Sequence, residues 1–235
     1  VSNTMSDYNA NQEKIKKTIF DENVSDEIIN LKKEADSGVK KSMLKYGLIL
    51  FNGNGIQPDK SEGLQYIEKA AKENDKEAII QCANIYYQGE NGIEINKGKA
   101  AKYFKKAAFY DDVESMYRYA LILYEGDGVP INKIEACEYF KQAAMNDHVE
   151  SMVRYAKMLH YNDGLEDYNG DSSKEDANKI EASKFYKKAI EKGNVKAMFY
   201  YSNFLLDGEG VAKNLIEAER YMKMAAENGH VYAMN

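Results

Sequence analysis

Three histidines are the side chains in this sequence best suited to proton transfer or metal binding near neutral pH. His148 and His230 occupy the same place in two copies of a repeated segment, and His160 lies elsewhere in its copy. Copies of a stacked repeat lie one repeat or more apart, so these imidazoles would not share a metal ion. We therefore predict no metal site and no catalytic residue. Other copies carry small polar residues where His148 and His230 lie: Asp75, Asp112 and Asn194.

Paired glycines are a second feature with possible chemistry, because G-x-G turns cradle phosphate groups in nucleotide-binding proteins. The pairs are Gly53 with Gly55, Gly126 with Gly128, and Gly208 with Gly210. A phosphate loop follows a β-strand and opens into a helix with a Lys–Ser/Thr pair or a third glycine. Here an amphipathic helical segment precedes each turn, so we interpret the first glycine as a helix end. We predict no bound cofactor.

The composition excludes further classes of function. The 235 residues carry a net charge of −6, which argues against a nucleic-acid backbone as the partner. No apolar run approaches the roughly 18 residues of a membrane span, so we expect no membrane insertion. Cys82 and Cys137 fall in different repeats and on different helices. We interpret them as buried thiols in a reducing compartment, and expect a cytoplasmic protein.

The elements that carry these residues recur about every 36 residues. A period between about 34 and 47 residues predicts a helical solenoid, in which each unit packs against its neighbours. The fold class that we expect is therefore all-α. A small residue opens each copy at Ser42, Ala78, Ser115, Ser151, Ala197 and Ala233, at spacings of 36, 37, 36, 46 and 36 residues.

Each copy contains two amphipathic segments, which we name helix A and helix B. Helix A has apolar or small residues at helical spacing, and its third copy carries Met116, Tyr119, Ala120 and Leu123. Helix B repeats a small–aromatic–small pattern in which the aromatic side chain would fill the groove between neighbouring helices. Ala136, Tyr139 and Ala143 represent this pattern. A polar residue precedes each helix B as an expected N-cap: Asp59, Asn96, Asn132, Asn178 and Asn214.

The repeat spacing also predicts the domain organisation. Residues 1–25 would form a polar tail and a short capping helix at Asn11–Phe20, and residues 26–235 would form the repeat array. An acidic insertion between Asn162 and Asn178 lengthens the fourth repeat and should be a mobile loop. The array would comprise a half-repeat at 26–38, repeats at about 39–74, 75–111, 112–147, 148–193 and 194–229, and a stub at 230–235.

The strings EACEYFKQAAMNDHVESM, from Glu135 to Met152, and EGDGVPINKIEA, from Glu125 to Ala136, carry a family resemblance. They match A-x-x-(Y/W)-(Y/F)-x-x-A-A followed by a small turn, and G-x-G-V-P before helix B. The sequence thus resembles the Sel1-like repeats, relatives of the tetratricopeptide repeats. That resemblance implies a right-handed α/α superhelical solenoid of helix-turn-helix repeats that acts as an adaptor or scaffold.

In related helical arrays, helix A lines the concave surface. Its non-core positions here are more apolar and aromatic than a solvated helix face. Asn84 and Asn203 fall where tetratricopeptide relatives use asparagine to bond a peptide backbone. The alternative is that these side chains fill a tightly wound superhelix and pack on the next repeat. The candidate peptide-binding residues are Ile80, Asn84, Tyr87, Tyr117, Tyr124, Lys157, His160, Phe199 and Asn203.

The expected function is non-enzymatic protein–protein interaction, with a partner protein or an extended peptide along the helix A surface. The alternative is a regulatory repeat domain attached to a catalytic domain in a longer polypeptide. The acidic insertion would favour basic ligands by electrostatic steering. The open repeat end at residues 230–235 predicts weak self-association.

Overall fold

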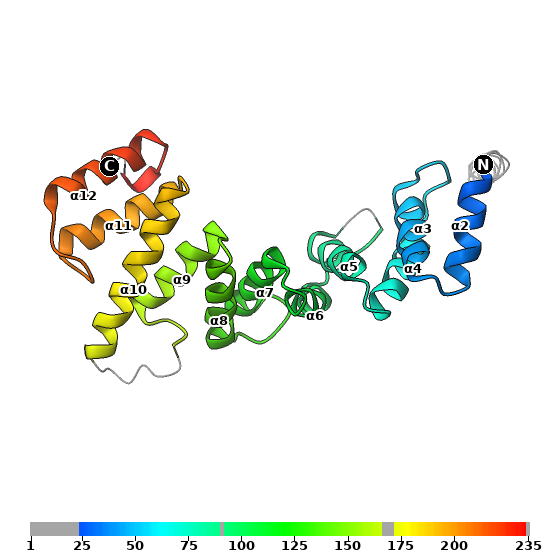
Figure 1. Cartoon of the computed structure of the whole chain (residues 1–235), viewed down its shortest axis with the longest axis horizontal. Helices are drawn as coiled ribbons and strands as arrows, with labels where there is room; N and C mark the ends of the chain where they lie inside the picture. Colours follow the sequence, from blue (N-terminus) through cyan, green and yellow to red (C-terminus); the bar gives the residue numbers. More distant parts are fainter. Residues whose placement is uncertain (1–23, 90–91, 166–171, 234–235) are drawn as a thin grey trace, which may run out of the picture. The chain divides into compact units, whose positions relative to one another are not determined.

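A computed structural model describes residues 24–89, 92–165 and 172–233 (Figure 1). Its regular elements within these ranges are eleven α-helices and one short 3-10 helix, which confirms the predicted all-α class. Two compact units make up the chain: unit 1 ends at Tyr110, and unit 2 begins at Asp111. The predicted capping helix at Asn11–Phe20 lies outside the described residues.

Unit 1 is built from helices that pack against their neighbours in chain order. The helix α2 corresponds to the predicted half-repeat, α3 and α5 are A helices, and α4 and α6 are B helices. Their bounds are α2 Asp26–Asp36, α3 Lys40–Asn52, α4 Lys60–Lys72, α5 Lys76–Gln88 and α6 Lys97–Ala108.

Unit 2 contains three further helix pairs, α7 with α8, α9 with α10, and α11 with α12, and a final turn η1. The odd-numbered helices are the A helices, as in unit 1. The bounds are α7 Val113–Glu125, α8 Lys133–Met145, α9 Val149–Tyr161, α10 Ser172–Glu191, α11 Val195–Asp207, α12 Leu215–Glu227 and η1 Val231–Ala233.

Polar side chains begin the B helices at four of the five predicted N-caps. Each accepts a hydrogen bond of 2.8 to 3.1 Å from the backbone amide three residues later. The amide of each cap also bonds a carbonyl near the end of the preceding A helix at 2.8 to 2.9 Å, which closes the helix pair. The confirmed caps are Asp59, Asn96, Asn132 and Asn214.

The predicted cap at Asn178 is wrong. The helix α10 begins six residues earlier, at Ser172, and Asn178 lies inside it. The Nδ2 atom of Asn178 instead donates a 2.9 Å hydrogen bond to Oδ1 of Asn162, which ends α9 in the left-handed conformation. The insertion supplies extra residues, so this B helix is not forced to begin where the others do. Part of the predicted mobile loop is therefore helical, and residues 166–171 lie outside the described ranges.

Aromatic pairs join each A helix to the following B helix. Tyr119 meets Tyr139 edge to face, with ring centroids 4.9 Å apart, and Tyr155 meets Phe185 similarly at 5.0 Å. This geometry is the preferred one for aromatic rings. The pattern predicted Tyr139 as the groove-filling residue, but Tyr139 is half-buried and the neighbouring Phe140 is fully buried. The flanking small residues Ala136 and Ala143 are fully buried, as expected.

Candidate functional site

A groove of about 550 Å³ lies on the helix A side of unit 2. The A helices α7, α9 and α11 line it together with η1, so successive repeats each contribute one wall. We call it the helix A groove. Its lining residues include Tyr117, Glu150, Arg154, Lys157, Lys196, Tyr200 and His230.

Two tyrosines supply the aromatic part of this groove. Tyr117 is half-buried, with its ring 4.5 Å from that of His148 and 6.0 Å from that of Phe140. Burial raises the pKa of its hydroxyl, and the nearby Arg154 partly opposes this rise. Tyr200 stacks on the buried Tyr186 at 5.7 Å. The two rings therefore present supported, amphipathic surfaces to whatever occupies the groove.

Three cations line the same groove: Arg154 and Lys157 on α9, and Lys196 on α11. Arg154 and Lys157 are half-buried, and Lys196 is exposed. The Nζ atom of Lys157 lies 4.9 Å from the ring centroid of Tyr200, within the range of a cation–π interaction. Glu150 is the lining residue of opposite charge.

The two histidines at equivalent repeat positions have packing roles. His148 is the N-cap of α9, where its Nδ1 accepts a 3.2 Å hydrogen bond from the amide of Ser151. His230 stacks on Phe199 at 4.4 Å. Burial lowers the pKa of His230, and Lys196 lowers it further. These contacts agree with the interpretation of His148 as a turn residue.

Tyr124, a predicted peptide contact, is bonded within unit 2. Its hydroxyl donates to Oδ2 of Asp163 at 2.8 Å, and Nζ of Lys133 lies 2.9 Å from Oδ1 of the same carboxylate. The side chain borders a smaller hollow of about 50 Å³ that shares Arg154 and Lys157 with the helix A groove. Tyr124 therefore fits the packing alternative better than the binding one.

His160, another predicted contact, joins three elements of unit 2. Its Nε2 atom lies 2.9 Å from Oε2 of Glu209, and Lys179 lies 2.9 Å from Oε1 of the same residue. Its ring meets Phe204 edge to face at 4.6 Å. Burial lowers the pKa of His160, although Glu209 acts in the opposite direction.

The remaining predicted residues are half-buried on A helices. Phe199 and Asn203 lie on α11 in unit 2. Ile80, Asn84 and Tyr87 lie on α5 in unit 1, where Tyr87 packs on Phe104 at 5.7 Å and has Nζ of Lys97 3.3 Å from its ring centroid.

Unit 1 has its own hollow on the helix A side, of about 480 Å³, which Leu44 and Leu48 line. The α5 residues Ile80, Asn84 and Tyr87 are not among its lining residues. The predicted peptide-binding set is thus divided between the two units, and its role in binding stays a prediction.

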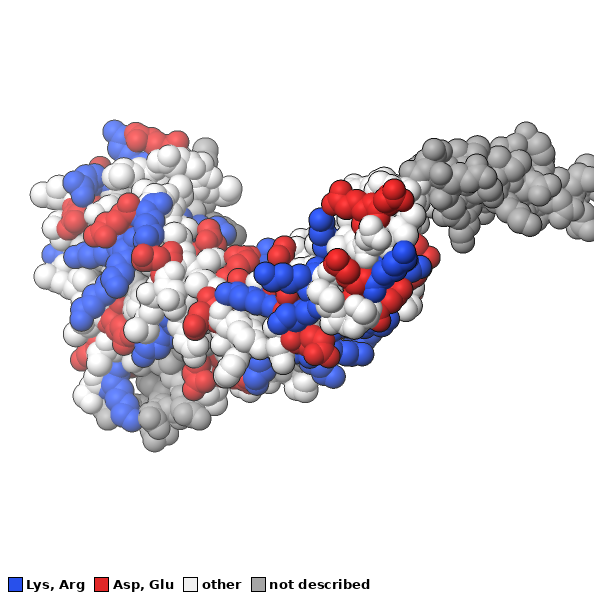
Figure 2. All heavy atoms as spheres, turned by 45° about the vertical axis from the view of Figure 1, so that its right-hand side comes forward, with Lys and Arg blue, Asp and Glu red and all other residues white. Residues whose placement is uncertain are grey.

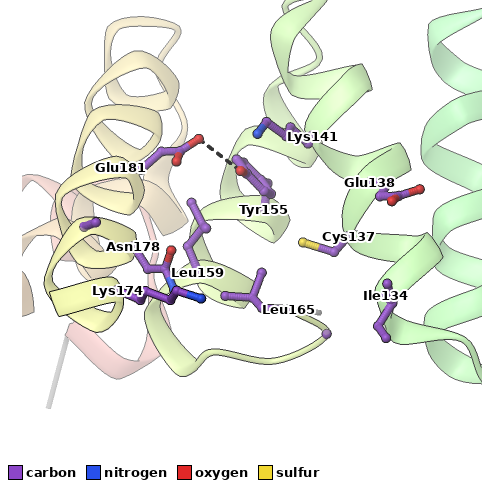
Figure 3. A pocket seen from close by; sticks show the side chains of 12 residues that line it. Ile134, Cys137, Glu138, Lys141, Tyr155, Leu159, Leu165, Lys174, Asn178 and Glu181 are labelled. Atoms are coloured by element: carbon purple, nitrogen blue, oxygen red, sulfur yellow. Dashed lines mark hydrogen bonds between the residues drawn. The ribbon is translucent and has the colours of Figure 1, made fainter. Parts of the chain in front are cut away.

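A cleft of about 380 Å³ lies elsewhere in unit 2, between α8, α9 and α10 (Figure 3). Across it, the hydroxyl of Tyr155 donates a 3.0 Å hydrogen bond to Glu181. Cys137 lies in its wall as a free thiol, and burial raises the pKa of that thiol to about 12. Such a thiol stays protonated near neutral pH and is a poor nucleophile. Burial also raises the pKa of Cys82 to about 12.

The described residues hold no cluster of histidine, cysteine and acidic side chains that could bind a metal ion. Within the same ranges, no helix is long and apolar enough to cross a membrane. On the face in Figure 2, basic and acidic side chains are interspersed among the described residues. None of these observations favours catalysis or nucleic-acid binding.

Solved structures share this fold. A Sel1 repeat protein from Oxalobacter formigenes is 25% identical, with a TM-score of 0.57 over 86% of this chain and 78% of that protein. A protective antigen of uropathogenic Escherichia coli, which displays an SLR fold, is 23% identical, with a TM-score of 0.57 over 88% of this chain. The aligned part spans 50% of that antigen. No curated protein matches the chain in sequence.

The Sel1 repeat family matches the chain five times, at residues 40–75, 76–108, 113–148, 149–194 and 195–230. Repeats of this family are generally non-catalytic modules for protein–protein interaction. The matches cover most of the sequence and coincide with the helix pairs of both units. The chain therefore belongs to the Sel1 repeat family.

Proposed function

We propose that this protein is a non-enzymatic scaffold that binds an extended segment of a partner protein along the helix A groove of unit 2. The observation that carries the proposal is the groove itself, which three successive A helices line with aromatic and charged side chains. A hollow lined by supported aromatic rings and a few polar groups is a typical site for a bound peptide.

The lining residues have the properties of interface anchors. Tyrosine supplies a large contact area at low entropic cost, and its hydroxyl can orient a ligand. Tyr117 and Tyr200 are both half-buried, so their rings are held in place while part of each stays accessible. Asn194 also lines the groove, and an asparagine can bond both an amide and a carbonyl of an extended chain.

A random peptide library panned against the whole chain tests this proposal. Lys196→Trp would fill the groove with a bulky ring, and Lys223→Trp on α12 is the matched control, since Lys223 is exposed and does not line the groove. We expect enriched peptides to bind the wild-type chain and the Lys223 variant, and to lose binding to the Lys196 variant. Equal binding to all three proteins would place the ligand elsewhere.

The alternative function is a regulatory repeat domain attached to a catalytic domain in a longer polypeptide. In that case the groove would take a segment of the attached domain.

Three further expectations stay predictions: the cytoplasmic location, the repeat boundaries near 39, 75, 112, 148 and 194, and weak self-association through residues 230–235. The free, buried thiols of Cys82 and Cys137 support the cytoplasmic location. The exposed Ile216 and Tyr232 near the end of unit 2 support the self-association.

A further inference from the structure

We infer that the segment bound in the helix A groove is acidic, with its carboxylates placed against Arg154, Lys157 and Lys196. This inference rests on the proposed function and names the chemistry of the partner. It concerns unit 2 alone, because all three cations lie on α9 and α11.

The charge of the groove carries the inference. Three cations line it against one carboxylate, that of Glu150. Among the described residues, none of these cations lies within 4.0 Å of a carboxylate oxygen.

The nearby acids already have partners. Glu114 bonds Arg118 at 2.7 Å, and Asp163 bonds Lys133 at 2.9 Å. A carboxylate brought by a ligand would therefore meet three cations in a groove that Glu150 lines as the one acidic residue.

Two of these cations lie near tyrosines of the groove. Lys157 lies over Tyr200, and Arg154 interacts with the hydroxyl of Tyr117, which counteracts the rise in its pKa that burial causes. Arg154 is half-buried, and the planar fork of a guanidinium matches the two oxygens of a carboxylate. The same rings offer apolar surface to the residues between the carboxylates. An extended segment that alternates acidic with aromatic or aliphatic residues fits this arrangement.

The inferred charge reverses the preference for basic ligands that the acidic insertion predicts. Residues 166–171 of that insertion lie outside the described ranges, whereas the groove cations lie on α9 and α11. Pairing at short range in a half-buried site outweighs steering by exposed charges, which salt screens.

Three labelled peptides of equal length test the inference by fluorescence anisotropy with the whole chain. In these peptides tyrosine alternates with glutamate, glutamine or lysine. We expect the glutamate peptide to bind about tenfold or more tightly than the glutamine peptide, and to weaken as salt is added. The double variant Arg154→Gln, Lys157→Gln should remove that advantage. The control Lys184→Gln, Lys223→Gln removes two exposed lysines outside the groove and should keep it.

A charge reversal gives a second readout. With Arg154→Glu and Lys157→Glu, the lysine peptide should become the preferred one, provided that thermal unfolding shows an intact fold. If the α9 variants unfold, Lys196→Gln replaces them as the test, because it changes an exposed side chain. This variant should lower the affinity of the glutamate peptide and reduce the salt dependence of its binding. Equal binding of the glutamate and glutamine peptides, both abolished by Lys196→Trp, would overturn the acidic inference and leave the proposed function standing. Peptide binding that Lys196→Trp does not change would overturn the proposed function.

Discussion

The hydroxyl of Tyr124 donates a 2.8 Å hydrogen bond to Oδ2 of Asp163. Asp163 follows the last turn of α9 and also pairs with Lys133, at the start of α8. The three side chains thus connect the helix pair α7–α8 to the next repeat. Lys133 and the Tyr124 hydroxyl hold the pKa of the Asp163 carboxyl below its ordinary value, against the effect of burial. Tyr124, whose spacing predicts contact with a ligand, is therefore part of the interface between two repeats.

Removal of this hydroxyl should weaken the fold. We expect Tyr124→Phe to lower the free energy of unfolding by about 1 kcal/mol, because Asp163 loses a hydrogen bond while the ring packing stays. Urea titration followed by circular dichroism measures the change. Tyr161→Phe is the control, since Tyr161 is exposed and should tolerate the change. Unchanged stability for Tyr124→Phe, together with weaker peptide binding, would return this hydroxyl to the binding role.

Helix caps give a second prediction. Asn132→Ala and Asn214→Ala should each lower the free energy of unfolding by about 1 kcal/mol, the usual loss of an N-cap. Asn178→Ala should cost less, because Asn178 lies inside α10 and alanine favours the helical conformation. Thermal unfolding of the three variants checks this order. A loss at Asn178 as large as at Asn132 would indicate that the bond to Asn162 is as important as a cap.

The sequence predicts the repeat elements well because each one depends on local chemistry. Gly126 ends α7 in the left-handed conformation, with φ 72°, and Asn132 begins α8 as its N-cap. Both follow from residue type and position alone. Asn178 misleads because its role was assigned by analogy with other repeats. The inserted residues allow a longer helix, and a comparison of the repeats does not show where that helix begins.

The groove could be predicted only in part. Helical spacing places Tyr117 and Lys157 on the A helices, but it does not reveal which side chains bond within the fold. Tyr124 is bound by Asp163 of the next repeat, and His160 is bound in the same way by Glu209. The residue pattern of one repeat does not show which side chain of the next repeat it will meet. Arg154 and Lys196 were missed because a charged residue on an amphipathic helix is ordinarily solvated. The role that we propose for these two cations depends on their position between the A helices. That position is set by packing between repeats.

A close approach of backbones provides a third prediction. Gly210 has φ 63°, and a Cβ atom there would lie 2.4 Å from the carbonyl carbon of Lys179 in α10. Gly208 has φ 76°, and its nearest contact would be a side-chain atom of Lys213 at 3.4 Å. Both alanine variants should lower the free energy of unfolding by roughly 1 kcal/mol, because alanine is strained in the left-handed conformation. Only Gly210→Ala should lose more, because the α10 backbone must move. Equal unfolding midpoints for the two variants would contradict this close approach.

Acidification should weaken unit 2 through His160. Burial lowers the pKa of this imidazole below its ordinary value of 6.5, so the unfolded chain takes up a proton at a pH where the folded chain does not. The unfolded state then binds more protons, and the free energy of unfolding falls as pH drops below about 6.5. The pKa of Glu209 is also lowered, chiefly by its hydrogen bond from Lys179, so its stabilisation is lost at more acidic pH. Both groups change stability in the same direction.

The measurement is the unfolding midpoint in urea between about pH 7.5 and about pH 5.5, a range that spans the ordinary titration of histidine. We expect the wild-type midpoint to fall with pH and His160→Gln to show a shallower fall, whatever its midpoint at the higher pH. His230→Asn should also reduce the slope, because burial lowers the pKa of His230 as well. An NMR titration of the histidine rings tests the cause directly, and His160 should titrate below 6.5. If it titrates above that value and stability rises on acidification, the 2.9 Å contact with Glu209 outweighs burial.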